Sequence, residues 1–430
     1  MFKFNFSAAD LEVDEDDILQ QEQDTQTVDE ELSKPLSSLS VSPSSATATP
    51  VVPAAQLNIQ SSSCLHSLPS TLHYELAQIP VLQQGTGAGT AIATDTKTGA
   101  QKEVVTIYKR NLEDVKFQII QEDDELDGDD KKQDKEAAPG TITGPGGVEM
   151  LALAGKSDLV KGVYEGGLKT WECALDLVAY LADQKQNYDG QKVLELGCGS
   201  ALPGIFVLTQ SNTVQVDLQD YNDQVLKFVT LPNVLLNTHV RPDQQPERTE
   251  DDDEEEEEEK PAPKEPATDG EQADDEDDEE EEEEDAEPEK NPEDGDFDNI
   301  ELDLPDSDED RLALMKKVEA QSRFFLGDWS GLVDLLEFKS DEDKYDLILT
   351  SETIYAEESH SKLYATIKNS LKRGGKALVA AKTFYFGVGG DILSFRRLIE
   401  QDGVFDIKVV FSAQAFVRRE ILELTFKVKA

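Results

Sequence analysis

A short apolar strand that runs into a glycine turn and then into a helix is the feature that most constrains the fold of this chain. It spans residues 193–204 and reads Val-Leu-Glu-Leu-Gly-Cys-Gly-Ser-Ala-Leu-Pro-Gly. Gly197 and Gly199 let backbone N–H groups and a helix N-terminus approach a ligand closely. In open α/β sheets, ligands bind at the carboxyl ends of the strands. The motif therefore predicts an α/β fold with a ligand site at this turn.

Strands and helices alternate around this motif, which is the pattern of parallel β-α-β units. The expected strands are residues 192–196, 213–218, 324–326, 345–350, 377–381, 405–412 and 421–428. The expected helices are residues 171–182, 203–210, 223–238 with a break at Pro232, 311–321, 359–371 and 391–400. No helix separates the last two strands, so they form a hairpin. We therefore expect a Rossmann-like, seven-stranded, mostly parallel sheet with helices on both faces and a C-terminal antiparallel β-hairpin.

The net charge of −52 comes mainly from one segment. Residues 251–310 contain 36 acidic residues and 3 lysines, a net −33, so the other 370 residues carry only −19. Such a segment buries too little apolar surface to fold, and it repels the phosphates of nucleic acids and membranes. It attracts basic proteins instead. We expect a basic protein partner, no direct nucleic-acid binding and no membrane partner.

Composition divides the chain into five parts. They are a disordered N-terminal region (1–70), a partly ordered extension (71–147), the first part of the α/β domain (148–246), a disordered acidic insertion (247–310) and the second part of the domain (311–430). Within the extension, residues 104–107 and 115–120 have the composition of strands. The long insertion is tolerated because the entropy of loop closure grows only logarithmically with length.

The cysteines and the apolar segments bound the cellular compartment. Cys64, Cys173 and Cys198 show no C-x-x-C spacing, which indicates a reducing compartment and disfavours a disulfide scaffold or a zinc site. No basic N-terminal region precedes an apolar stretch, and no run of about 18 apolar residues occurs. We expect the chain in the cytoplasm and nucleus, without a metal ion, a signal peptide or a transmembrane helix.

The acidic residue in the glycine motif indicates which ligand binds there. Glu195 lies two residues before Gly197, and the next glycine after Gly199 is Gly204, too late for the G-x-G-x-x-G fingerprint of dinucleotide binding. A carboxylate at this place would repel a pyrophosphate, which disfavours a dehydrogenase. It suits the cationic methionine end of S-adenosyl-L-methionine. An ordinary glycine turn of an α/β protein is the alternative.

Two more candidate sites follow later strands. Asp220, at the end of the second strand, is placed to accept hydrogen bonds from both ribose hydroxyls, with mid-strand Asp217 as a weaker candidate and a helix cap as the alternative role. Further on, Ser351 is placed to touch the cofactor, and Glu352 and Tyr355 to face the substrate. The absence of an Asn-Pro-Pro-Tyr-like sequence here disfavours methylation of bases or glutamine.

Several segments resemble the protein histidine methyltransferase family. They are residues 157–173 (Ser-Asp-Leu-Val-Lys-Gly-Val-Tyr-Glu-Gly-Gly-Leu-Lys-Thr-Trp-Glu-Cys), 349–355 (Leu-Thr-Ser-Glu-Thr-Ile-Tyr), 385–390 (Tyr-Phe-Gly-Val-Gly-Gly) and 2–6 (Phe-Lys-Phe-Asn-Phe). The resemblance covers about 150–240 and 320–430 and excludes the acidic segment. It implies cofactor contacts at Thr170, Trp171, Glu172, Cys173, Ala174, Gly197, Gln219, Asp220, Tyr221, Gly327, Asp328, Trp329 and Ser351. Ala201 departs from relatives that carry a third glycine, and the two remaining glycines should keep the turn.

The resemblance also implies an activity. It implies methyl transfer from S-adenosyl-L-methionine to a histidine side chain, at the tele nitrogen, of a ribosomal protein of the large subunit. Glu352 is our candidate to hold the proton on the other ring nitrogen. Two alternatives stay open: a protein lysine methyltransferase of the same fold, and an acidic chaperone-like protein that binds basic clients on a degenerate methyltransferase fold. The intact Glu195, Gly197, Gly199 and Asp220 speak against the chaperone.

Overall fold

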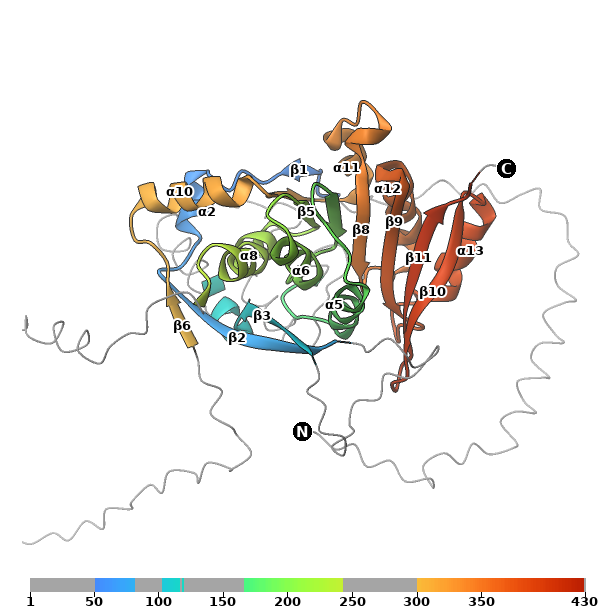
Figure 1. Ribbon diagram of the computed structural model, residues 1–430, viewed down its shortest axis with the longest axis horizontal. Coiled ribbons are helices and arrows are strands. Elements are labelled where there is room, and N and C mark those ends of the chain that lie inside the picture. The colour runs from blue at the N-terminus through green and yellow to red at the C-terminus, as the bar shows by residue number, and fades with distance from the viewer. Residues whose placement is uncertain (1–50, 82–102, 117, 120–165, 243–299, 429–430) are drawn as a thin grey trace, which may run out of the picture. The chain divides into compact units, whose positions relative to one another are not determined.

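The computed structural model describes residues 51–81, 103–116, 118–119, 166–242 and 300–428, all within one compact unit, Pro50–Ala430 (Figure 1). The predictions for residues 1–50, for the start of the domain at 148 and for most of the acidic segment lie outside the described residues. So do the resemblance segment 2–6 and most of 157–173.

The main sheet has eight strands in the order β1-β7-β5-β4-β8-β9-β11-β10. The strands are β1 (Ala55–Gln56), β4 (Lys192–Leu196), β5 (Gln215–Asp220), β7 (Ser322–Leu326), β8 (Tyr345–Ser351), β9 (Leu371–Lys382), β10 (Phe405–Ala413) and β11 (Arg419–Phe426). The five strands from β7 to β9 are parallel, and β11 is antiparallel to both β9 and β10. The predicted seven-stranded sheet with its terminal hairpin is confirmed, and the two-residue β1 adds an eighth, antiparallel strand at the β7 edge.

Helices cover both faces of this sheet. They are α2 (Ser62–His66), α5 (Glu172–Gln184), α6 (Leu202–Gln210), α7 (Asp223–Val225), the π-helix η2 (Leu226–Thr230), α8 (Leu231–Thr238), α10 (Asp308–Glu319), α11 (Trp329–Leu336), α12 (His360–Ser370) and α13 (Ile392–Asp402), with short 3₁₀ turns at Asp341–Asp343 and Glu357–Ser359. Neighbouring strand residues point to opposite faces. Phe324 therefore packs with α5, α6 and α8, whereas Phe325 packs with α11, α12 and α13.

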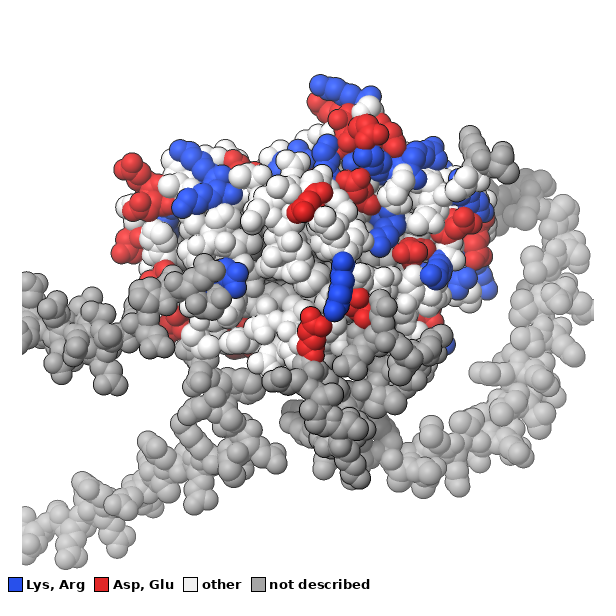
Figure 2. Space-filling model, viewed as in Figure 1, with Lys and Arg blue, Asp and Glu red and all other residues white. Residues whose placement is uncertain are grey.

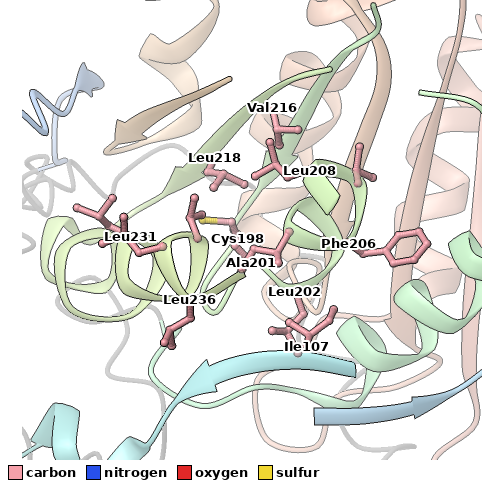
Figure 3. Packing of buried hydrophobic residues seen from close by; sticks show 14 of the residues in the cluster. Ile107, Cys198, Ala201, Leu202, Phe206, Leu208, Val216, Leu218, Leu231 and Leu236 are labelled. Carbon is pink, nitrogen blue, oxygen red and sulfur yellow. The ribbon is translucent and has the colours of Figure 1, made fainter. Parts of the chain in front are cut away.

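A second sheet, β3-β2-β6, lies over α6 and α8. Its strands are β2 (Thr71–Pro80), β3 (Val104–Arg110) and β6 (Ile300–Asp303). Figure 3 shows Leu202 of α6 and Leu236 of α8 near Ile107 of β3, while Val216 and Leu218 of β5 lie on the other side of α6. These helices are thus buried between two sheets, which the sequence analysis did not anticipate.

The structure corrects the bounds of two regions predicted to be disordered. Residues 51–70 contain β1 and α2, and the last residues of the predicted insertion contain β6 and the start of α10. Buried Leu302 of β6 pairs with Leu72 of β2. Polar composition averaged over a long segment predicts disorder. It does not indicate a short strand whose backbone hydrogen bonds are made with a strand distant in the sequence.

Three local predictions were wrong. Residues 112–116 and 118–119 are helical, because Val115 and Ile119 lie four residues apart and bury one helix face against Phe228. The helix does not break at Pro232, because a π turn immediately precedes it, with the Leu231 N–H bonded to the Leu226 carbonyl. Strand β9 starts at Leu371, six residues before the expected start, through a Gly-Gly pair that favoured a turn.

Charged side chains of both signs are interspersed over the face of the molecule that Figure 2 shows. This agrees with a fold whose acidity lies mainly in one segment. All three cysteines are buried and unpaired. Among the described residues, no helix combines the length and apolarity needed to cross a membrane.

Candidate active site

The glycine turn after β4 is tight because both glycines have left-handed backbone conformations. Gly197 and Gly199 have φ angles of 61° and 51°. A Cβ on Gly197 would lie 2.5 Å from the Thr353 methyl group, and one on Gly199 would lie 3.3 Å from the Gly167 Cα. The turn therefore requires glycine at both positions, as predicted.

Side chains of the second-sheet side hold this turn in place. Thr230 Oγ1 donates to the Gly199 carbonyl at 2.6 Å, and Asn233 Nδ2 donates to the Ser200 carbonyl at 3.0 Å. Asn233 Oδ1 also accepts from the Arg110 N–H of β3 at 2.7 Å. Thr170 and Ser200 share a hydroxyl hydrogen bond of 2.9 Å. Of these, only Thr170 was among the sequence candidates.

Ala201 ends the turn in a conformation that favours glycine. It is the N-cap of α6, is fully buried and has φ 57°. An L-residue in this region costs about 1–2 kcal/mol. The methyl group is accommodated, as expected, although the left-handed backbone conformation is one that glycine adopts more readily.

Gln219 joins three of the predicted cofactor segments. Its Oε1 accepts from the Gly197 N–H at 3.2 Å and from Trp329 Nε1 at 2.7 Å. Its Nε2 donates to the Gly327 carbonyl at 2.8 Å. The ends of β4, β5 and β7 are thus held together by one buried amide, a role that residue type alone did not indicate.

Asp220 lies at the end of β5 with both carboxylate oxygens turned to backbone. Oδ2 accepts from the Gly199 N–H at 2.9 Å and Oδ1 from the Asn222 N–H at 3.2 Å. Asp217 instead forms a two-bond ion pair with Arg323 and accepts from the Tyr345 hydroxyl, so it is engaged inside the sheet. The position at the strand end therefore favours Asp220 over Asp217 for a ribose, and Tyr221 follows it half-buried.

The segment after β7, which is predicted to contact the cofactor, also makes contacts that stabilise the fold. A Cβ on Gly327 would lie 2.3 Å from the Pro53 carbonyl oxygen, so glycine is needed where the chain before β1 crosses. Asp328 caps α11 and pairs with Lys362 at 2.7 Å. Although partial burial raises the pKa of Asp328, the hydrogen bonds from Lys362 and Ser330 lower it overall. Trp329, the first residue of α11, is half-buried.

Glu195 is fully buried in the middle of the site. Its Oε2 accepts from the Gly204 N–H of α6 at 2.8 Å, whereas Oε1 has no hydrogen-bond partner among the described residues. Burial raises its pKa to about 8, against the opposing effect of the Gly204 hydrogen bond. The unpaired oxygen is the feature expected of a group that meets a cationic ligand.

Glu352, just after β8, is the second buried carboxylate of the site. Its φ is 58°, and neither carboxylate oxygen has a hydrogen-bond partner among the described residues. Lys382, at the end of β9, places its Nζ 3.6 Å from Oε1. Burial, and then the Glu352 carboxylate, raise the pKa of Cys173 and of Tyr385 far above their usual ranges. The structure thus brings Glu352 next to the start of α5 and the end of β9.

Trp171 lies between two ammonium groups at this end of the site. Lys169 Nζ is 5.4 Å and Lys382 Nζ 4.9 Å from the ring centroid. Glu172 pairs with Lys382 at 3.0 Å. Burial lowers the pKa of Lys382, but the carboxylates of Glu352 and Glu172 raise it overall. The sequence analysis missed Lys382, because its importance depends on strand order.

The remaining candidates divide between the core and the rim. Ala174 is buried in α5, while Ser351 and Tyr355 are half-buried after β8. A cavity of about 610 Å³ between β3, α5, α6 and α8 contains none of the predicted site residues in its lining. In the described parts of the chain, no group of three or more His, Cys, Asp or Glu side chains is placed to hold a metal ion.

S-adenosyl-L-methionine is the cofactor that this arrangement fits. The glycine turn leaves no room for a Cβ at Gly197, the unpaired Glu195 oxygen suits a cationic group, and Asp220 ends the neighbouring strand. Gly197, Gly199, Gln219, Asp220 and Trp329 are connected by hydrogen bonds or close contact around one turn. The individual cofactor contacts, and the catalytic roles of Glu352 and Tyr355, stay predictions.

Comparison with known proteins identifies the family. A family described as lysine methyltransferase matches residues 156–250. "Histidine protein methyltransferase 1 homolog" of Mus musculus is 33% identical over 276 residues, 64% of this chain and 61% of that protein, so the chain spans less than two thirds of that relative. A solved TehB-like SAM-dependent methyltransferase from Corynebacterium glutamicum is 14% identical, with a TM-score of 0.32 and coverage of 66% of this chain and 100% of that chain, a likeness too low to add to the assignment.

"Histidine protein methyltransferase 1" of Schizosaccharomyces pombe matches over a larger share of its length. It is 31% identical over 330 residues, which are 74% of this chain and 76% of that protein. With this identity over three quarters of a relative, the chain belongs to the histidine protein methyltransferase 1 family.

Proposed function

We propose that this chain is an S-adenosyl-L-methionine-dependent protein-histidine N-methyltransferase that modifies the tele nitrogen of a histidine in a basic ribosomal protein of the large subunit. The observation that carries the proposal is the buried Glu352 carboxylate at the end of β8, with no hydrogen-bond partner among the described residues. An unpaired buried acceptor is costly unless a ligand supplies the donor. An imidazole N–H is such a donor.

Histidine suits a site that has a hydrogen-bond acceptor but little need for a strong base. The bound cofactor supplies a methyl group on a positively charged sulfur. Histidine has a pKa near 6.5 and is mostly neutral at pH 7, so one ring nitrogen already carries a free lone pair. A bond forms between this nitrogen and the methyl carbon while the carbon–sulfur bond breaks, and its electron pair stays on sulfur. The chain therefore contributes mainly positioning and the exclusion of water.

Glu352 also accounts for the choice of ring nitrogen. If its carboxylate accepts the N–H of Nδ1, the lone pair lies on Nε2, which is the tele nitrogen. Transfer makes the ring cationic, and the carboxylate stabilises this charge until the Nδ1 proton leaves to solvent. The Lys382 ammonium group lies 3.6 Å from Glu352 Oε1, so the ion pair holds the carboxylate beside the end of β9. Tyr355, three residues after Glu352, is half-buried at the same rim and is our candidate for contact with the substrate.

A lysine acceptor is the second candidate function, and the family match described as lysine methyltransferase favours it. A substrate lysine must lose a proton before it can attack. It would also bring a second ammonium group next to Lys382, and like charges at short distance disfavour each other. The surroundings of Glu352 therefore support histidine over lysine.

The acidic segment supports a basic protein partner. Residues 251–310 carry a net −33, whereas acidic and basic residues are mixed over the described fold. A concentrated charge of one sign raises the association rate of an oppositely charged partner. We propose that this segment attracts the basic substrate, and that the protein acts in the cytoplasm and nucleus, where such substrates are made and assembled.

The test is methyl transfer with a chemical readout of the acceptor. Purified chain is incubated with labelled cofactor and large-subunit ribosomal proteins, and the labelled protein is hydrolysed in acid. We expect the label in tele-methylhistidine. Label in methyllysine would show that the acceptor is lysine. Label in pros-methylhistidine would show that Nδ1, not Nε2, attacks the methyl group. The absence of any cofactor binding in calorimetry would favour the chaperone-like alternative.

A further inference from the structure

The exposed phenylalanines of the described residues gather at one end of the sheet. Phe384, Phe386 and Phe416 are 46%, 70% and 100% exposed, and no other phenylalanine described by the structure is exposed to this degree. Val388, 39% exposed, lies in the same segment as Phe384 and Phe386. We call these four residues the phenylalanine patch. Clustered exposed apolar side chains mark interaction sites, because a partner that covers them removes a large apolar area from water.

The patch is built from two segments that leave the sheet at the same point. Residues 383–391 follow β9, and residues 414–418 form the tip of the β10–β11 hairpin. Lys382 and Arg419 are paired in the β9–β11 ladder, and the Thr383 N–H donates to the Arg418 carbonyl at 2.8 Å. Figure 1 shows the β10–β11 hairpin running to the lower end of the sheet.

Alternation along the first segment connects the patch with Glu352. Phe384 and Phe386 point outward and pack edge to face, 4.9 Å between ring centroids. Tyr385, between them, turns inward: its hydroxyl accepts from the Lys382 N–H at 3.3 Å, and its pKa is raised by burial and then by the Glu352 carboxylate. The phenylalanines are therefore the outer side of a segment whose inner side meets the proposed acceptor carboxylate.

The same segment is attached to the other side of the rim. The Gly390 N–H donates to the Tyr355 carbonyl at 2.8 Å. A Cβ on Gly390 would lie 2.1 Å from the Ile354 carbonyl oxygen, so only glycine permits this contact. The loop is thus closely packed against the residues that follow Glu352, and the patch is continuous with the candidate acceptor site.

The charges next to the patch distinguish between kinds of partner. Three cations of the described residues next to the patch are paired with carboxylates: Arg418 with Glu420, Arg419 with Asp176 and Lys382 with Glu172. An anionic lipid surface is held by unpaired basic residues, which these pairs do not provide. An apolar stretch of polypeptide needs no such charges.

We propose that the phenylalanine patch binds the stretch of the substrate protein that flanks the methylated histidine, through apolar side chains of that stretch. The inference rests on the proposed function, because a protein that places a side chain at Glu352 has to cross this rim. Few residues carry most of the affinity of an interface, and exposed aromatic anchors are prominent among them. The patch would thus select the substrate by its apolar sequence, while the acidic segment attracts its charge.

The test uses the full chain and the ribosomal protein that the wild type labels. We expect Phe384→Ser/Phe386→Ser, and separately Phe416→Ser, to raise KM for this protein about tenfold or more, as for loss of an interface anchor, with kcat and cofactor affinity nearly unchanged. The matched control is Leu76→Ser/Val104→Ser, which removes two exposed apolar side chains (41% and 46%) from the second sheet. The control should leave KM unchanged.

The outcomes separate the two proposals. Histidine labelling with an unchanged KM in both patch variants would overturn the docking surface and leave the proposed function intact. Labelling of lysine, together with the KM increase in the patch variants, would overturn the histidine assignment and leave the docking surface intact. A wild-type dimer in sedimentation velocity that the patch variants abolish without affecting KM, or binding to phosphatidylserine vesicles that they abolish, would assign the patch to another partner and overturn the inference. No transfer to any protein would refute both.

Discussion

The two halves of the candidate site differ in how many of their polar groups have hydrogen-bond partners. On the cofactor half, at the ends of β4, β5 and β7, the glycine turn is tied down by Thr230, Asn233, Gln219 and Asp220. On the acceptor half, at the ends of β8 and β9, Glu352 has no hydrogen-bond partner among the described residues. In the first half the turn is fixed without a ligand and only one oxygen of Glu195 lacks a partner, whereas in the second neither oxygen of Glu352 has a hydrogen-bond partner among the described residues.

The difference reflects what each half has to bind. A small cofactor that is the same in every turnover is bound best by a site fixed in advance, because ordering a mobile site reduces affinity. An acceptor histidine arrives as part of a protein and brings its own N–H donor. Substitutions in the cofactor half should therefore alter cofactor affinity, and substitutions in the acceptor half should alter the rate of methyl transfer.

The largest effect is expected from Glu352→Gln. A glutamine can turn its amide toward the ring and cannot balance the charge that develops on it. We expect kcat to fall about 10²–10⁴-fold, the range for a lost acid–base group. Cofactor affinity, measured by calorimetry, should stay within a factor of about two, because Glu352 belongs to the acceptor half.

Glu420→Gln is the matched control, since Glu420 is a buried carboxylate that pairs with Arg418, whereas Glu352 pairs with Lys382. It should keep nearly wild-type kcat. Unchanged turnover in Glu352→Gln would remove the proposed role, and weaker cofactor binding would contradict the separation of the halves.

The next effect tests the cofactor half. Gly197→Ala would force an L-residue into φ 61° and place its Cβ 2.5 Å from the Thr353 methyl group. The conformation alone costs about 1–2 kcal/mol, and the contact adds to it. We expect cofactor affinity to fall about 100-fold, or about 2.7 kcal/mol.

Gly190→Ala provides the control for this change. Gly190 has a similar φ of 70°, but nothing lies within 4 Å of its would-be Cβ. Both variants therefore carry the backbone penalty of an L-residue at positive φ, but only Gly197→Ala adds the close contact with Thr353. Equal cofactor affinities of the two variants would show that the turn adjusts to a side chain and does not bind through its backbone.

The fold was predictable where one strand or helix carried its own pattern. Residues 192–196 form the predicted strand without any shift, because the apolar Val193, Leu194 and Leu196 directly precede a glycine. The second sheet was not predictable, because Ile300–Asp303 becomes a strand only through pairing with β2, more than 200 residues earlier. Long-range pairing of this kind leaves little trace in local composition.

The candidate site shows the same limit. Gly197, Gly199 and Asp220 were identified from motif spacing, and the structure brings them together. Lys382 and Cys173 approach Glu352 only because β9 and α5 flank the end of β8. Asn233, in the middle of a helix, gave no signal at all, although it connects the second sheet with the glycine turn.

A third prediction uses the pH dependence of Glu195. Its pKa is raised from 4.5 to about 8 in the folded chain, so unfolding releases a proton between these values. The group therefore contributes stability that is fully present below pH 4.5 and is lost as the pH rises toward 8. The slope is about 1.4 kcal/mol per pH unit for one proton. Glu195→Gln should flatten this decline when the free energy of unfolding is measured at pH 5.5 and 7.0.

Cofactor binding sharpens the same measurement. If the unpaired Glu195 oxygen meets the cationic cofactor, binding should release the Glu195 proton at pH 7. Calorimetry in buffers of different ionisation enthalpy would detect that release in the wild type and not in Glu195→Gln. The same binding enthalpy in every buffer would mean that Glu195 does not meet the cofactor and serves only to hold α6 through its hydrogen bond with Gly204.

The smallest effect concerns the bond that connects α8 with the glycine turn. Thr230→Val keeps the side-chain shape but removes the hydrogen bond to the Gly199 carbonyl, at a net loss of about 1 kcal/mol. If the turn is fixed in advance by this bond, cofactor affinity should fall about fivefold with kcat unchanged. Thr238→Val removes a bond of the same 2.6 Å length from the following helix, α8, but to Val234 within that helix. Its affinity should equal that of the wild type, and an equal loss in both variants would show that helix stability, not the tie to the turn, determines how the cofactor half binds.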